Sequence, residues 1–476
     1  MKTAIGKRGF SVLKEELSST DFSDIKKDLT VKPFINGDYG MKPVPFPVYC
    51  ESNKKIYLPR HYGQKKFGLP LETKLNEPES ITINFSKKLK DKQKPIVDAY
   101  LKAANKVGGG IISVPCGYGK TVIGLYISSI LKVKTLVVVH KEFLLNQWKE
   151  RIKEFLPDAK IGRLQSTFIH VEGYDIVIGM LQSISMIDYS ESVFSKFGLV
   201  IYDECHHLGA ETFSKALMKT NCKYTLGLSA TPKRLDGLSK VFEWSLGEIV
   251  YSIKKRDDSN VNVKMIMYIN KEPSYSKEIF NYNKKPNSAK MINNICEFYP
   301  RTQKITEHLA DCLKDGRKIL MLSDRREHLK VIHVLIQSIE NGKYSSGFYL
   351  GGMKEKDLQE TETKDVILGT FMMASEGFDC KYPLDTIFLM SPKSNIEQAV
   401  GRILRQDEKD RKFIPLIYDI VDEFSLFAKQ KLKRIAFYNK NNYNIKFYDN
   451  DKKEIQVYIP EKGRRKKKEK DLEFLD

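Results

Sequence analysis

Short apolar runs alternate with helix-length amphipathic segments from about residue 90 to about residue 425, and this rhythm constrains the fold most. The first group of runs comprises IISV at Ile111, TLVVVH at Thr135, YDIVIGML at Tyr174, FGLVIYDE at Phe197 and YTLGLSAT at Tyr224. The second group comprises KILMLSD at Lys318, GFYLGG at Gly347, VILGTF at Val366, TIFLMSP at Thr386 and FIPLIYDI at Phe413. This alternation is typical of buried parallel strands that are covered by helices. The polar SIKKRDDSN after Tyr251 separates the groups, so we predict an α/β protein with two similar domains in tandem.

The two ends of the chain differ from this pattern. Residues 1 to about 85 contain FPVYCES and KKIYLP with prolines nearby, which predicts a small β-containing accessory domain. After Val421, SLFAKQKLKRIAFYNK reads as a helix and YNIKFYDNDKKEIQVYIP as a hairpin turning at Asp449 to Asp451. The tail GRRKKKEKD is either a solvated charge run or a nucleic-acid or nuclear-targeting segment. The predicted division is 1–85, 86–255, 256–425 and 426–476, the last being a C-terminal extension.

A glycine-bearing turn follows the first apolar run and precedes a helix. It reads PCGYGKT and comprises Pro115, Cys116, Gly117, Tyr118, Gly119, Lys120 and Thr121. The first N–H groups of a helix lack partners, so such a loop can wrap a phosphate, with the lysine as a point charge and the threonine hydroxyl on Mg²⁺. The general pattern has glycine where this chain has Val114. The loop therefore predicts a nucleoside triphosphate site, with a chance glycine turn as the alternative.

A pair of carboxylates ends another apolar run. In LVIYDECHH, Asp203 and Glu204 lie side by side, so one can hold Mg²⁺ and the other can deprotonate an attacking water. The pair therefore predicts hydrolysis. An acidic, solvated strand end is the alternative.

Three further sets of polar residues follow strands, each weak alone. They are Ser229 and Thr231 in LSATPKRLD, Gly377 and Asp379 in TFMMASEGFD, and Gln398, Arg402 and Arg405 in IEQAVGRILRQ. The last stretch reads as a helix, on which the two arginines share a face because they are three residues apart. Arginines so placed can stabilise charge on a γ-phosphate. A solvated basic helix is the alternative.

Composition indicates a polyanionic partner. The 476 residues include 80 Lys and Arg against 60 Asp and Glu, a net charge of +20, which favours nucleic acid unless it reflects a lysine-rich proteome. No apolar run approaches the roughly 20 residues that span a bilayer, and the N-terminus lacks a signal-peptide core, so we expect an intracellular, soluble protein without a membrane partner. The seven cysteines form no CxxC pair, which predicts reduced thiols. Adjacent Cys205, His206 and His207 cannot close on one metal ion.

The order of these motifs resembles that of the superfamily 2 helicases, over roughly residues 85 to 425. PCGYGKT, DECHH in place of DEAD, and SATPKR look like the branch that contains the eukaryotic transcription and repair helicase. Within it, YLGGMKEKDL, ASEGFDC and SPKSNIEQAVGRILRQ look most like the transcript-release helicases of poxviruses and other large DNA viruses. The resemblance implies two RecA-like domains that close on ATP at their interface.

The resemblance also implies residue roles. It assigns Lys120, Asp203, Glu204, Gln398, Arg402 and Arg405 to catalysis, Thr121 and Asp203 to Mg²⁺, and the phosphate loop with Gly377 and Asp379 to ATP. It assigns coupling of hydrolysis to movement to His206, Ser229 and Thr231, and nucleic-acid contacts to His140, Lys141, Gln147, Trp148, Gln182, Arg234 and Thr370. Gln93 matches a glutamine that reads adenine, unless it is a plain surface residue. Leu235 stands where the cellular relative has glutamate, which puts a strand-separating role of Arg234 to Asp236 in doubt.

The sequence thus predicts an ATP- and Mg²⁺-dependent motor on nucleic acid, with double-stranded DNA as the expected partner. Viral transcript release or DNA repair, with transcription machinery as a further partner, is the expected process. For a viral protein the host cytoplasm or the virion is the expected location, and a monomer the expected state. The alternatives are an RNA helicase, a restriction-enzyme motor subunit and a basic binding protein with a degenerate ATPase core.

Overall fold

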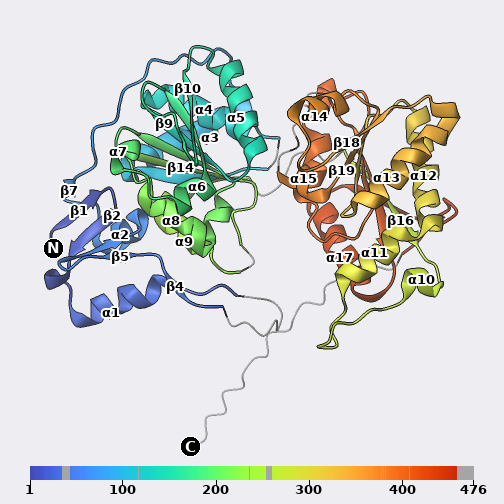
Figure 1. The fold of residues 1–476 in the computed structure, drawn as a ribbon, viewed down its shortest axis with the longest axis horizontal. Coiled ribbons are helices and arrows are strands. Elements are labelled where there is room, and N and C mark those ends of the chain that lie inside the picture. The colour runs from blue at the N-terminus through green and yellow to red at the C-terminus, as the bar shows by residue number, and fades with distance from the viewer. Residues whose placement is uncertain are drawn as a thin grey trace, which may run out of the picture. The chain divides into compact units, whose positions relative to one another are not determined.

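The structure is a computed structural model and describes residues 1–34, 43–115, 117–234, 236–253, 260–376, 378, 380, 382–406 and 408–457. The chain divides into two compact units. The first comprises Met1–Asp257 with Ser375–Asp379, and the second comprises Asp258–Ala374 with Cys380–Asp476. Figure 1 labels the elements of both units.

The N-terminal part of the first unit is built on a small, mostly antiparallel sheet in the order β5-β6-β2-β1-β7. Its strands are β1 (Thr3–Gly6), β2 (Gly9–Leu13), β5 (Cys50–Glu51), β6 (Lys55–Leu58) and β7 (Glu72–Thr73). Beside it lie α1 (Ser19–Asp28), α2 (Arg60–Phe67) and the two-stranded pair β3 (Thr30–Val31) and β4 (Phe46–Pro47). Phe10 and Ile56 of this sheet belong to one buried cluster with Leu136 and Val200 of the next. The predicted β-containing N-terminal region is present and packs on the α/β part of its own unit.

The α/β part of the first unit is an eight-stranded sheet in the order β11-β10-β12-β9-β13-β14-β8-β15. Its strands are β8 (Gly109–Ser113), β9 (Thr135–Val139), β10 (Ile161–Gln165), β11 (Phe168–Ile169), β12 (Ile176–Met180), β13 (Leu199–Asp203), β14 (Tyr224–Ser229) and β15 (Ile249–Ser252). The pairs are parallel except for β10 with the short edge strand β11. The five strands predicted here are all found.

Helices cover both faces of this sheet, which is why its central strands are apolar throughout. The helices are α3 (Lys94–Val107), α4 (Lys120–Leu131), α5 (Glu142–Phe155), α6 (Leu181–Met186), α7 (Glu191–Phe194), α8 (Glu211–Lys219) and α9 (Ser239–Leu246), with 3₁₀ turns η2 (Asp91–Gln93) and η3 (Cys205–Gly209). Val137 and Ile201 pack with residues of α3, α4 and α5, whereas Leu136 and Val200 pack with residues of α6, α8 and α9. Successive strand residues therefore serve opposite helical layers.

The second unit repeats this architecture, with the strand order β18-β19-β17-β20-β21-β16-β22-β23. Its strands are β16 (Asn262–Tyr268), β17 (Ile319–Leu322), β18 (Ser346–Tyr349), β19 (Val366–Gly369), β20 (Thr386–Leu389), β21 (Leu416–Asp422), β22 (Asn444–Tyr448) and β23 (Glu454–Ile455). Its helices are α10 (Pro273–Ser276), α11 (Ser288–Glu297), α12 (Tyr299–Lys314), α13 (Arg326–Ser338), α14 (Glu355–Thr361), α15 (Phe371–Glu376), α16 (Glu397–Val400) and α17 (Ser425–Lys440), with 3₁₀ turns η4 (Ile339–Gly342), η5 (Gly401–Leu404) and η6 (Glu408–Asp410). The five strands predicted for this group are also present.

The predicted C-terminal hairpin forms, and it extends the second sheet. β22 pairs in parallel with β16 and in antiparallel with β23, and the turn is closed by the Asp449 N–H on the Lys453 carbonyl. The helix expected after Val421 is α17. Residues 425–457 therefore belong structurally to the second unit, and the basic tail lies outside the described residues.

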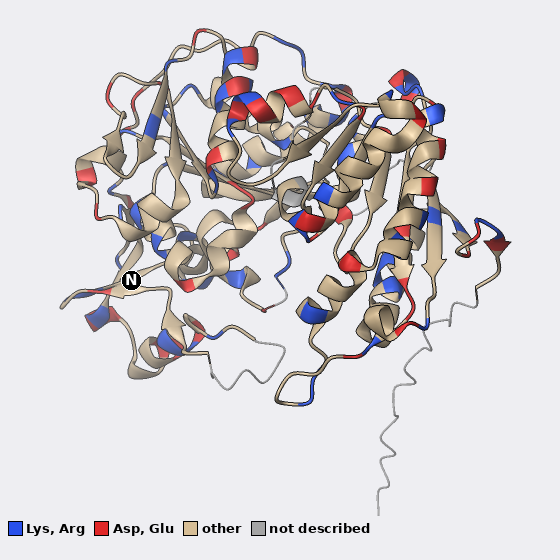
Figure 2. Cartoon of the chain, turned by 45° about the vertical axis from the view of Figure 1, so that its right-hand side comes forward, with Lys and Arg blue, Asp and Glu red and all other residues tan. Residues whose placement is uncertain are grey.

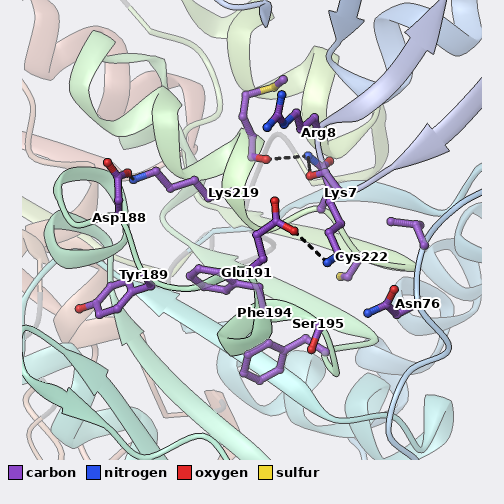
Figure 3. A pocket seen from close by; sticks show the side chains of 14 residues that line it. Lys7, Arg8, Asn76, Asp188, Tyr189, Glu191, Phe194, Ser195, Lys219 and Cys222 are labelled. Carbon is purple, nitrogen blue, oxygen red and sulfur yellow. Dashed lines mark hydrogen bonds and ion pairs between the residues drawn. The ribbon is translucent and has the colours of Figure 1, made fainter. Parts of the chain in front are cut away.

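A cavity of about 410 Å³ lies within the first unit between the N-terminal sheet and the α/β part (Figure 3). Lys7 and Arg8 of the β1–β2 turn face Tyr189, Phe194 and Lys219 across it. Lys7 pairs with Glu191 at 3.1 Å and Lys219 with Asp188 at 2.8 Å. No residue predicted for ATP or nucleic acid lines it, so the cavity lies apart from the predicted chemistry.

The predicted fold class is confirmed: the chain contains two tandem RecA-like α/β domains with parallel sheets. None of the helices in the described residues is both long and apolar enough to span a bilayer. Every cysteine in the described part of the chain is a free thiol.

Candidate functional site

The phosphate loop connects β8 to α4, where two glycines turn the chain. Gly117 and Gly119 have φ values of +89° and +77°, a left-handed conformation that favours glycine. Gly119 also precedes the first helical residue, Lys120, so the free N–H groups of α4 begin at this turn. A loop of this shape at the start of a helix of 12 residues suits a bound phosphate.

Gln93 forms part of the wall of this loop. Its buried amide nitrogen donates to the Tyr118 carbonyl at 2.9 Å, and its oxygen accepts from the Lys90 N–H at 3.0 Å. A Cβ on Gly119 would lie 2.6 Å from the Gln93 amide nitrogen, so a larger residue would displace this contact. Gln93 is thus buried beside the loop, and adenine reading stays a prediction.

The two carboxylates lie at the carboxyl end of β13, as the sequence predicted. Glu204 adopts φ +47°, which is uncommon for a residue with a side chain, and its N–H donates to Asp203 Oδ1 at 3.0 Å. This turn leads directly from the strand into η3. Burial and the neighbouring Glu204 charge raise the pKa of Asp203. Lys120 Nζ lies 3.0 Å from Glu204 Oε1, with both side chains mostly buried.

Glu204 also connects Lys120 of the phosphate loop to residues at the end of the next strand, β14. Its Oε2 lies 3.3 Å from Nδ1 of His206, and the same nitrogen lies 3.1 Å from Oγ of Ser229 at the end of β14. Ser229 Oγ in turn accepts the Thr231 N–H at 3.2 Å. Burial alone would raise the pKa of Glu204, but the Lys120 ammonium and His206 outweigh it and hold that pKa well below its ordinary value. Glu204 is therefore an anion that three predicted motifs share.

Trp148 corrects one prediction. It was assigned to nucleic acid, but its side chain is 0% exposed, and its indole N–H donates to Asp203 Oδ2 at 2.9 Å. Because α5 packs against the sheet beside β13, the indole orients the carboxylate from inside the core. No sequence pattern distinguished this role, since a tryptophan on an amphipathic helix reads equally as core or contact residue.

His140 is also buried, so its side chain is not presented to a nucleic acid. Its ring lies 4.0 Å from that of His207, which lies 4.3 Å from that of His206. Burial lowers the pKa of His140 to about 4 and that of His207 to about 3, so both rings are neutral at neutral pH. Gln182 donates to the His140 carbonyl at 2.7 Å and thereby joins two of the segments assigned to nucleic acid.

Lys141 and Gln147 are half-buried, and their nucleic-acid contacts stay predictions. Burial lowers the pKa of Lys141.

Arg234 contacts protein in this structure. Its guanidinium binds both carboxylate oxygens of Asp236 and donates to the His206 carbonyl. Its stem packs on Gly209, where a Cβ would lie 2.6 Å from Arg234 Cδ. Arg234 therefore connects the loop after β14 to η3, an arrangement that residue spacing did not reveal.

In the second unit, the basic segment forms one α-helical turn followed by a 3₁₀ turn. Gln398 lies in α16 and Arg402 in η5, with Arg405 directly after it, and all three are half-buried. The prediction of one continuous helix is corrected, since Gly401 is a poor helix former at the junction. Residues three apart eclipse in a 3₁₀ turn, so the two arginines still share a side.

Arg434 of α17 supports the segment that leads to these arginines, a role that was not predicted. It donates to Asp419 of β21 and to the Lys393 carbonyl, each at 2.8 Å, and Tyr438 also donates to Asp419, at 2.9 Å. The sequence feature that could have indicated this role is Arg434 among apolar residues of a helix, shortly after an apolar strand that contains Asp419. Thr370 is half-buried and its hydroxyl accepts the Met373 N–H at 3.4 Å, capping α15, so its nucleic-acid contact stays a prediction.

Three predicted ATP-site residues, Cys116, Gly377 and Asp379, lie outside the described residues. Pro115 is buried, and Thr121 is half-buried in the first turn of α4. Within the first unit, the structure brings together Lys120, Asp203, Glu204, His206, Ser229 and Thr231.

Comparisons with known proteins agree with this site. The family described as "Type III restriction enzyme, res subunit" matches residues 86–234. The protein named "Putative ATP-dependent RNA helicase L396" of Acanthamoeba polyphaga mimivirus is 35% identical over 94% of this chain and 87% of its own length. QP509L of African swine fever virus (isolate Pig/Kenya/KEN-50/1950), given the same description, is 25% identical over 78% of this chain and 75% of its own. The "DNA 3'-5' translocase XPB2" of Sulfurisphaera tokodaii is 39% identical over 34% of this chain and 35% of its own length.

The matched family region contains the phosphate loop and the acidic motif DECHH, which begins with Asp203 and Glu204. The similarity to the mimivirus relative extends across both units. They support ATP hydrolysis and nucleic-acid binding by this chain. The chain therefore belongs to the superfamily 2 helicases, in the family of ATP-dependent helicases from large DNA viruses.

Proposed function

We propose that this helicase uses ATP and Mg²⁺ to move along duplex DNA, in viral transcript release or in DNA repair. The observation that carries the proposal is the chain of contacts from Lys120 through Glu204 and His206 to Ser229. It connects the phosphate-binding loop to the strand end from which the segment after β14 departs. A change at the γ-phosphate can thereby alter the position of this segment.

In this proposal Lys120 binds phosphate, which would draw its ammonium away from Glu204. Without the ammonium beside it, burial makes Glu204 a stronger base, which then accepts the proton of the attacking water. His206 holds Glu204 in position. Because the same ring nitrogen contacts Ser229, a change in the charge or position of Glu204 would also shift Ser229.

Asp203 and Thr121 would hold Mg²⁺, because carboxylate and hydroxyl oxygens are the ligands it prefers. Asp203 fits a metal ion because it is a buried carboxylate beside a second carboxylate, Glu204. A cation bound there would offset the repulsion between the two negative charges. The bound ion would neutralise charge on the phosphates. Trp148 keeps the Asp203 carboxylate in one orientation for that purpose.

From the second unit we propose that Gln398, Arg402 and Arg405 act on the phosphate during hydrolysis. The 3₁₀ turn places both arginines on one side, and Arg434 supports the segment through the Lys393 carbonyl. An arginine that contacts the transferred phosphoryl group stabilises the charge of the transition state. Gly377 and Asp379 are proposed to contact ATP as well.

DNA is the proposed track for two reasons. First, the acidic motif is DECHH, as in the transcription and repair branch. Second, the relative named as a DNA translocase is 39% identical over the region that it matches. A net charge of +20 supports a polyanion of either kind. Transcription machinery is the proposed partner of a transcript-release enzyme.

RNA is the second candidate, because the mimivirus and African swine fever virus relatives are both described as RNA helicases. The test is ATPase activity of the full chain with duplex DNA, single-stranded DNA and RNA in parallel, at matched nucleotide concentration and salt. Stimulation by duplex DNA supports the proposal. Stimulation by RNA alone would replace DNA as the track, and no stimulation by any polymer would contradict the motor function.

A further inference from the structure

A hairpin in the second unit projects aromatic side chains that no core residue covers. It comprises residues 277–287, between α10 and α11, and we name it the Tyr282 hairpin (Figure 1). Tyr282 is 108% exposed and Phe280 is 53% exposed. Large aromatic rings contribute most when they are buried, so full exposure at a tip points to a partner.

The hairpin is an ordered element with its own hydrogen bonds. Phe280 and Pro286 form an antiparallel bridge, and the Asn281 N–H donates to the Lys285 carbonyl at 2.7 Å. The Asn287 amide donates to the Asn281 side chain at 2.7 Å. These bonds hold Tyr282 at the tip before any partner arrives, which lowers the entropic cost of binding.

The base of the hairpin is fixed to the second unit. The Asn287 N–H donates to the Ile279 carbonyl, and Ile279 packs against the buried cluster of the second sheet. The Asn287 side chain also accepts the Lys290 N–H and so caps α11. The base of the hairpin is therefore bonded directly to the start of α11.

The charge around the tip is positive. Four lysines (Lys277, Lys284, Lys285 and Lys290) stand against one glutamate (Glu278) between residues 277 and 290, a net charge of +3. Within the part of the chain that the structure describes, these lysines form no ion pair, and Figure 2 shows basic residues along projecting segments of this unit. Exposed rings beside unpaired cations suit a strand whose bases stack and whose phosphates are anionic.

We propose that the Tyr282 hairpin binds an unpaired nucleic-acid strand, with a base stacked on Tyr282 and phosphates at Lys284 and Lys285. A fully paired duplex has no free base face at its sides, so the hairpin distinguishes opened from closed strands. The proposal rests on the proposed function and adds to it a contact that senses strand separation.

The first experiment measures binding of the full chain to short oligothymidylate, oligouridylate and a blunt duplex by fluorescence anisotropy. Tyr282→Ala should raise the Kd for the single strands by about 5- to 150-fold, the range expected for one stacked base. Tyr282→Phe should bind as the wild type does, because the ring face is kept. Tyr299→Ala, an exposed tyrosine (49%) of the same unit, is the matched control and should change nothing. The Kd for the duplex should stay the same in all variants.

Two further measurements locate the contact. Cross-linking to oligonucleotides that contain 5-iodouracil should label the peptide with Tyr282. Lys284→Gln with Lys285→Gln should reduce the salt dependence of log Kd for single strands by a slope of about 1.4, at about 0.7 for each phosphate contact.

Unchanged single-strand affinity of Tyr282→Ala, without a cross-link at the hairpin, overturns this inference if DNA still stimulates hydrolysis. Absence of any nucleic-acid stimulation in the wild type would instead overturn the proposed function, and this inference with it. Comparison of the two oligonucleotides identifies whether the strand is DNA or RNA.

Discussion

Replacing Trp148 by phenylalanine tests whether this residue serves the ATP site from within the core. The substitution removes the indole N–H that donates to Asp203 Oδ2 at 2.9 Å. It also leaves a void beside α4, because the indole ring lies 3.3 Å from where a Cβ on Gly124 would be. Both consequences follow from complete burial of the side chain.

The magnitude has two parts. Loss of a hydrogen bond to a buried charged group costs about 1.5–3 kcal/mol. The void from a shortened core side chain adds about 1–2 kcal/mol, so the total destabilisation is about 2.5–5 kcal/mol. Because Asp203 loses its orienting partner, kcat for ATP should fall by about 10- to 100-fold, the range for residues that orient a metal ligand. Nucleic-acid affinity should remain unchanged.

The assay is urea denaturation followed by far-UV circular dichroism, together with ATPase rates and nucleic-acid binding. Trp244→Phe is the matched control, since Trp244 is partly buried and contacts the Tyr62 ring at 5.6 Å. It should show a smaller loss of stability and near-normal turnover. If Trp148→Phe kept full turnover but bound nucleic acid weakly, Trp148 would be a nucleic-acid contact and the reasoning here would be refuted.

Three further predictions concern the second unit. Asp422→Ala should destabilise the protein by about 3–5 kcal/mol in urea denaturation, because Arg301 would be left buried without its counterion. Arg301 donates to Asp422 at 2.7 and 2.9 Å. A loss below about 1 kcal/mol would contradict this prediction. Burial lowers the pKa of His328 from 6.5 to about 3, so the unfolded state binds the extra proton and this residue alone should lower stability by about 1.4 kcal/mol per unit as pH drops from 6.5 towards 3. His140 and His207 add to the slope in the same way, so His328→Gln should reduce the slope by that amount, and an unchanged slope would contradict the prediction. Arg405→Ala should reduce turnover by about 10³-fold or more with an unchanged nucleic-acid Kd in anisotropy titrations, whereas lost binding with intact turnover would make it a nucleic-acid contact.

The sequence predicted what depends on local periodicity and on chemistry at strand ends. All ten predicted strands form, because runs such as Thr135–Val139 are buried on both faces and permit few other arrangements. The phosphate loop and the Asp203–Glu204 pair lie at the carboxyl ends of β8 and β13, two parallel strands of one sheet that β14 separates.

The sequence did not predict contacts that depend on how side chains meet across elements. The roles of Trp148 at Asp203 and of Arg234 at the His206 carbonyl require the packing of α5 and of the loop after β14. Pairing of β22 with β16 likewise joins residues far apart in the chain. The break between α16 and η5 falls at Gly401, a poor helix former, although the apolar spacing predicted one continuous helix.

The central claim is that Glu204 activates water in the site that Lys120 and Asp203 share. The most direct test is a single-turnover measurement of ATP hydrolysis by Glu204→Gln, with ATP affinity measured separately by a fluorescent ATP analogue. The amide keeps the size of the carboxylate but cannot accept the proton, so the rate should fall by about 10²-fold or more while ATP still binds. Hydrolysis at the wild-type rate would contradict the account.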